Sequence, residues 1–94
     1  MTKEDNMSNQ EFIRLCKEKV AQYFNAKKEK TDTTPQMQPD DVYVVWMCKT
    51  LQNHKALLST PASDGMYYEI TYNGDKNEMY FDAYKKWENI CFKL

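Results

Sequence analysis

The chain has 94 residues, of which 41% are hydrophobic and 29% charged, and its formal net charge is −1. This length allows one small domain, and the composition is typical of a globular chain rather than a disordered one. No apolar run approaches the ~18 residues that a membrane span requires, and the balanced charge supplies no global field for nucleic acid or an anionic membrane. We therefore expect no membrane partner.

The first predicted element is a helix over residues 9–28. Residues 1–8 are polar and expected to fray, and Ser8 with Glu11 has the spacing of a capping box, in which each side chain accepts from the other residue's backbone N–H. Behind it, apolar side chains recur at three- and four-residue steps, which predicts an amphipathic helix whose apolar side needs cover. These residues are Phe12, Ile13, Cys16, Val20, Tyr23 and Phe24.

A linker is predicted over residues 29–41, because this stretch holds Pro35 and Pro39 and shows no apolar periodicity. The pattern then changes to a β-branched and aromatic run from Val42 to Cys48, with apolar residues on both faces. Such a run predicts a central strand that is covered on more than one side.

Residues 42–81 predict two antiparallel hairpins. The first turns near Gln52 and Asn53, although the Leu57–Leu58 pair alone also fits a short helical turn. In the second, Met66, Tyr68, Ile70 and Tyr72 alternate with Tyr67, Glu69 and Thr71, the chain turns over Asn73–Asn77, and it returns over Glu78–Phe81. This alternation places Tyr67 and Tyr68 on opposite faces of the sheet.

A C-terminal helix is predicted over residues 82–94, with Asp82 as its cap and an apolar stripe of Tyr84, Trp87, Cys91 and Leu94. The alternative is a bent fifth strand. The expected fold class is α+β: a single domain with an N-terminal helix, an antiparallel sheet of about four strands in two hairpins, and a C-terminal helix.

The three cysteines, Cys16, Cys48 and Cys91, form an odd set without the CxxC spacing of redox or metal sites, and the N-terminus lacks the apolar segment of a secretory signal. A reducing cytoplasm is the expected compartment. Each cysteine sits within an apolar pattern, so we expect three small buried hydrophobic residues.

Two motifs, Trp46–Leu57 and Asp64–Lys76, together with the helix around Phe12–Lys17, resemble a family of small uncharacterised proteins encoded by phages and prophages of Gram-positive bacteria, catalogued as a domain of unknown function. The resemblance extends to Tyr84–Asn89. It implies a bacterial cytoplasm and brings no activity or ligand. A weaker resemblance links the element order to double-stranded-RNA-binding domains, but only Lys85–Lys86 stands where those domains carry a lysine-rich helix start.

The sequence predicts no catalytic, metal or cofactor site. The single histidine, His54, falls in a polar hairpin and is interpreted as a solvated turn residue, although a catalytic pairing with a cysteine or serine through the tertiary fold stays open. Four carboxylates lack the spacing of known cation-binding loops and are interpreted as a polar strand face. They are Glu69, Asp75, Glu78 and Asp82.

Binding is the better-supported class of function. The hairpin around residues 49–55 gathers cations and amides that can hold a phosphate or a partner's backbone, and the aromatic content exceeds what a core of this size encloses, so some aromatic side chains should be exposed. The candidate binding residues are Trp46, Lys49, Gln52, Asn53, His54, Lys55 and Tyr67.

The leading hypothesis is therefore a non-catalytic accessory protein that binds a host or phage protein, with inhibition of a host process such as defence as one form. The alternative is a nucleotide or nucleic-acid binder that uses Lys49, His54 and Lys55 beside Trp46 or Tyr67 as stacking surfaces. Homodimerisation through exposed aromatic side chains is also open.

Overall fold

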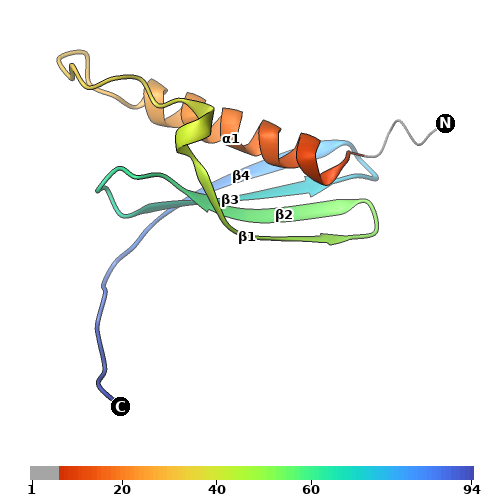
Figure 1. Cartoon of the computed structure of the whole chain (residues 1–94). Helices are drawn as coiled ribbons and strands as arrows, with labels where there is room; N and C mark the ends of the chain where they lie inside the picture. The colour runs from red at the N-terminus through yellow and green to blue at the C-terminus, as the bar shows by residue number, and fades with distance from the viewer. Residues whose placement is uncertain (1–6) are drawn as a thin grey trace.

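The computed structural model describes residues 7–94, so the fraying expected for residues 1–8 lies largely outside the described residues. One helix lies across a four-stranded sheet, and the chain ends in a segment that leaves the sheet (Figure 1). The elements are α1 Asn9–Ala26, the short 3-10 turn η2 Pro39–Asp41, and the strands β1 Tyr43–Thr50, β2 Asn53–Ser59, β3 Met66–Asn73 and β4 Glu78–Lys85.

Helix α1 begins as predicted. The Ser8 hydroxyl accepts from the Glu11 backbone N–H at 3.1 Å, and the Glu11 carboxylate accepts from the Ser8 backbone N–H at 2.9 Å, which completes the capping box. The helix ends at Ala26, two residues earlier than predicted. Its apolar stripe is buried at Phe12, Cys16 and Val20.

The linker is held against the helix by an amide. The Asn25 side chain donates to the Met37 carbonyl at 2.9 Å and accepts from the Met37 backbone N–H at 2.7 Å. Asn25 thus pairs both backbone groups of one residue twelve positions away, and this contact directs the chain into η2 and then into the first strand.

The sheet is an antiparallel meander in the order β1-β2-β3-β4, which confirms the α+β class and the antiparallel strands. Leu57 and Leu58 lie inside β2, so the helical-turn alternative for this pair is wrong. The first hairpin turns one residue earlier than expected, at Leu51–Gln52, and Leu51 takes a positive φ of 57° that a bulky residue rarely adopts.

The prediction of a doubly covered central strand for β1 is wrong, because β1 forms an edge of the sheet and most of its side chains are exposed. A β-bulge between Val44 and Trp46 leaves Val45 without a Cα partner on β2, so the apolar run does not alternate cleanly. The apolar residues of β1 occupy both faces of the sheet, because the face away from α1 carries exposed aromatic side chains.

The C-terminal helix predicted over residues 82–94 is not formed. Asp82 does not cap a helix, because β4 continues through Lys85 with Asp82 opposite Glu69 and Tyr84 opposite Tyr67. The ladder extends one residue further, since the Lys86 backbone N–H donates to the Gly65 carbonyl at 2.7 Å. Pairing with a complete neighbouring strand outweighs a local helical spacing, and residues 86–94 have no regular structure.

The core lies between α1 and one face of the sheet. It combines the helix stripe with alternating residues of β2 and β3, and its principal members are Phe12, Cys16, Val20, Ala56, Leu58, Tyr68, Ile70 and Tyr72. Because α1 covers one side only, no element of residues 7–94 packs on the opposite face of the sheet (Figure 1).

Candidate functional site

The predicted binding hairpin supplies structural contacts rather than one surface. The Gln52 amide donates to the Asp75 carboxylate at 2.6 Å, and the Asn53 side chain accepts from the Gly74 backbone N–H at 2.9 Å. These bonds join the β1–β2 turn to the β3–β4 turn. Gly74 is required there, because an added Cβ would lie 2.1 Å from the Gln52 carbonyl oxygen. Gln52 and Asn53 therefore hold two turns together.

His54 is buried, with 2% of its surface exposed, so its interpretation as a solvated turn residue is wrong. Its ring lies 4.8 Å from the Phe12 ring, and Nε2 is 2.9 Å from the Met7 carbonyl. Since a carbonyl only accepts, Nε2 carries the proton and Nδ1 is left buried without a partner. Desolvation lowers the pKa of His54, against the opposing effect of the Met7 carbonyl.

The two predicted lysines lie on opposite faces of the sheet. Lys49 pairs with His54 across the strands on the helix side, and its ammonium donates to the Leu51 carbonyl. Lys55 lies on the uncovered side, 3.4 Å from the Glu69 carboxylate. Because strand side chains alternate, neighbours in the sequence are separated by the sheet, and the predicted cluster of cations does not form.

The same alternation separates Cys48 from His54, the cysteine–histidine pair that lies close in the sequence. Cys48 is exposed and lies opposite Lys55 on the uncovered face, whereas His54 is buried on the helix side. Cys16 is buried, and burial raises its thiol pKa to about 12. Over residues 7–94, no group of three or more His, Cys, Asp or Glu side chains is placed to hold a metal ion. The expected burial of all three cysteines is confirmed for Cys16 alone.

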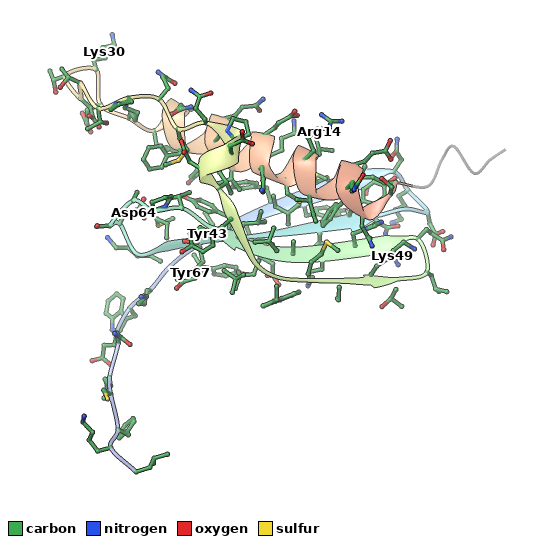
Figure 2. All side chains as sticks on the ribbon, in the orientation of Figure 1. Arg14, Lys30, Tyr43, Lys49, Asp64 and Tyr67 are labelled. Carbon is green, nitrogen blue, oxygen red and sulfur yellow. The ribbon has the colours of Figure 1, made fainter. Side chains whose placement is uncertain are left out.

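The uncovered side of the sheet gathers aromatic side chains, and we call it the aromatic face. Tyr67 lies opposite Tyr84 on β3 and β4, and Tyr43 begins β1 at the same end of the sheet. Figure 2 shows Tyr43 and Tyr67 pointing to the side away from α1. The aromatic face comprises Tyr43, Trp46, Tyr67, Tyr80 and Tyr84, with Leu57 between its two halves.

Exposed aromatic side chains were expected, and the aromatic face confirms this. Tyr43, Trp46, Tyr80 and Tyr84 are each between 42% and 51% exposed, whereas Tyr68 on the helix side is 1% exposed. Of the predicted binding residues, Trp46, Lys55 and Tyr67 lie on this face. Sequence reasoning missed Tyr43, Tyr80 and Tyr84, although Tyr80 and Tyr84 share the period-two spacing that continues through β4.

Hydrogen bonds hold two of these phenols. The Tyr84 hydroxyl donates to Glu69 at 3.1 Å and the Tyr80 hydroxyl donates to Glu78 at 2.6 Å. Each bond to a carboxylate, followed by the carboxylate's charge, raises the pKa of the phenol. The Lys86 ammonium lies 5.8 Å from the centre of the Tyr67 ring. The face thus presents ordered rings bordered by carboxylates.

On the helix side, a groove of about 540 Å³ runs between α1 and β4, because α1 lies nearer β1 and β2 than β4. Its lining is mainly apolar. The lining residues are Lys19, Gln22, Tyr23, Met79 and Phe81. The groove brings no further cluster of titratable side chains to the site.

No helix in residues 7–94 is long and apolar enough to cross a membrane.

Comparison with known proteins supplies a family. Neither curated proteins nor solved structures gave a match to the chain. The model of a family described as "Family of unknown function (DUF6275)" matches residues 13–94, which include most of α1, the whole sheet and the C-terminal segment. The match covers far more than half of the chain, and the protein therefore belongs to the DUF6275 family of unknown function.

Proposed function

We propose that this protein acts by non-catalytic binding, with the aromatic face as the surface that engages a partner protein. The observation that supports this proposal is the group of four aromatic side chains that are 42–51% exposed on a sheet face that no element of the described chain covers. Large aromatic side chains supply much of the energy of protein interfaces, and a contiguous exposed apolar surface marks an interaction site.

Charge favours a protein partner over a nucleic acid. The aromatic face carries the carboxylates of Glu69, Glu78 and Asp82, while its lysine Lys55 is 3.4 Å from Glu69 and the Lys86 ammonium lies over the Tyr67 ring. Binding to a polyanion depends on free cations that replace counterions, and carboxylates beside the rings oppose it. The nucleotide or nucleic-acid alternative is tested by titration at several salt concentrations, where a steep loss of affinity with salt would support it.

We further propose that the protein is a phage- or prophage-encoded accessory protein of the bacterial cytoplasm, and that its partner is a host or phage protein whose blocking inhibits a host process such as defence. The resemblance of the Trp46–Leu57 and Asp64–Lys76 motifs to phage proteins supports this origin. Neighbouring genes test it: genes for tail, replication or defence-inhibitor proteins beside this one would agree, and an unrelated metabolic operon would not.

The binding proposal is tested with variants of the aromatic face. A partner is captured from lysate of the bacterial host, identified and purified, and its affinity is then measured for the wild type and for Trp46→Ala and Tyr84→Ala. Each substitution should weaken binding by about 30-fold, the typical loss at an interface hot spot. Leu51→Ala serves as the control, because Leu51 is exposed at the turn and lies off the aromatic face. Unchanged affinity for both aromatic variants would refute the role of this face.

A further inference from the structure

The C-terminal segment, residues 86–94, exposes apolar side chains that nothing in the described chain covers. After the bond between Lys86 and Gly65 the segment leaves the sheet and runs away from α1, on the side of the aromatic face (Figure 1). Trp87 is 93% exposed, and Ile90, Phe92 and Leu94 are each at least 60% exposed. An apolar surface of this kind, on an extended segment, is suited to a partner rather than to water.

The segment has the side-chain pattern of a strand. Ile90, Phe92 and Leu94 occur at every second position, so an extended backbone presents all three on one side. The segment contains no glycine or proline, and it continues directly from β4. It can therefore lie on or beside a sheet in the conformation it already has.

We propose that the C-terminal segment of one copy of this chain lies on the aromatic face of a second copy, and that the exchange is reciprocal. This inference rests on the proposed function, since it names a second copy as one occupant of that binding face. The two surfaces are both apolar and both uncovered in the described chain. The charges of the segment, Lys86, Glu88 and Lys93, nearly cancel, so the apolar side chains rather than charge carry the contact.

The surface available is large enough for a stable dimer. Ile90, Phe92 and Leu94 share one side of the extended segment, and covering them removes about 300 Å² from each segment, at roughly 100 Å² per side chain. With the matching area on the face and the symmetric second contact, the total is about 1,200 Å², which reaches the range of specific interfaces. The Cα radius of gyration is 15.4 Å, whereas a compact chain of this length has about 12 Å, as expected when a segment projects from the domain.

A second copy fits this surface better than the chain's own segment does. To lie on its own aromatic face, the segment would have to reverse just after Lys86, whose backbone is bonded to Gly65 and whose ammonium lies over the Tyr67 ring. Reversals of this kind rely on turn-forming residues, and residues 86–94 hold one, Asn89, three positions beyond Lys86. In the direction the segment takes, it can reach a second copy without a reversal (Figure 1).

The exchange has a consequence for binding. The dimer covers the same face that a partner protein needs, so the partner and the second copy compete for it. The apparent affinity for the partner is then reduced by the fraction of chains whose face is free, and it should fall as the concentration of this protein rises.

Two natural cysteines test the exchange directly, because Cys48 lies on the aromatic face, Cys91 lies in the C-terminal segment, and both are exposed. Full-length Cys48→Ser and Cys91→Ser variants are treated with a short bis-maleimide cross-linker, each alone and as an equimolar mixture. The mixture should give cross-linked dimers at least about tenfold more than either variant alone, with Cys48 of one chain joined to Cys91 of the other. The buried Cys16 should not react.

Two outcomes would overturn the exchange. One is an equal yield of dimers from the mixture and from each variant alone. The other is a wild-type product in which Cys48 and Cys91 are joined within a monomer, which would show that the segment covers its own face.

Sedimentation of the full chain gives a second measurement. The wild type should be dimeric at micromolar concentration, Trp87→Ala/Phe92→Ala should weaken the dimer by about tenfold or more, and Leu51→Ala should leave it unchanged. A monomeric wild type whose Trp46→Ala variant still loses a partner protein would refute the exchange and leave the proposed binding function intact. A dimer whose face variants bind every partner normally would refute the proposed function and leave the exchange intact.

Discussion

The two faces of the sheet use similar residues for different purposes. On β3, Tyr68 and Tyr72 point toward α1 and are at most 3% exposed, whereas the preceding Tyr67 points to the other side beside Tyr84, which is 51% exposed. The residue type does not decide whether a side chain is buried, since both faces are rich in tyrosine. The position of α1 decides it: the face that α1 covers stabilises the fold, and the aromatic face stays exposed to solvent.

The largest expected difference between the faces lies in two adjacent tyrosines. Tyr68→Ala removes a ring that packs against Tyr23 and Phe81 in the core, at centroid distances of 5.8 Å and 5.7 Å. It should lower the free energy of unfolding by about 3–5 kcal/mol. Tyr67→Ala should cost about 1 kcal/mol or less, because that ring is only partly buried. Chemical denaturation of both variants measures the difference, and equal losses would contradict the division into two faces.

The next prediction concerns the pH dependence of stability, and it rests on His54, a polar residue on the covered face. Burial depresses the pKa of His54 in the folded state below its ordinary 6.5, so the unfolded chain binds the extra proton more readily. The stability contributed by the neutral ring is complete above the unfolded-state pKa and is lost as the pH falls through the folded-state pKa. The wild type should therefore lose stability below about pH 6.5, on the order of 1 kcal/mol for each unit of pKa difference.

His54→Gln is the matched variant for this effect. Its side-chain amide still donates to the Met7 carbonyl but does not titrate. Thermal melts between pH 7.5 and 5 should show a smaller decline for His54→Gln than for the wild type. A decline of the same size in both proteins would show that other groups account for the acid sensitivity.

The smallest effect is expected for charges on the aromatic face. Glu69→Gln removes the ion pair with Lys55, which is partly exposed, and should change the free energy of unfolding by less than about 1 kcal/mol. The same change should lower the pKa of Tyr84, because its hydrogen bond to the Glu69 carboxylate and then that group's charge raise it. Ultraviolet titration of the phenols checks the shift, with Glu78→Gln as a control that should act on Tyr80 instead.

Much of the fold was predictable from local sequence. Three features depend only on residues that are close in sequence. They are the capping box at Ser8 and Glu11, the apolar stripe of α1, and the alternation from Met66 to Tyr72. Local patterns of this kind carry over into the structure because the fold buries the same stripe that the pattern shows. The α+β class and the expected exposure of aromatic side chains followed from these patterns.

The candidate site was less predictable, because its residues are brought together by register. Lys49, His54 and Lys55 are close in sequence, but the strand alternation sends Lys55 to the face opposite Lys49 and His54. Tyr43, Tyr67 and Tyr84 are far apart in sequence and meet at one end of the sheet. A polar hairpin therefore suggested a site that does not form, while the aromatic face had no compact signature in the sequence.

Spacing and turn chemistry within the chain were sufficient to predict α1, the two hairpins and one small α+β domain. Three features followed from the fold instead: residues 82–85 extend β4 and do not start a helix, β1 is an edge strand, and His54 is buried. The reason is physical: backbone pairing with a neighbouring strand and cover by a helix depend on partners distant in the chain, which local propensity does not contain.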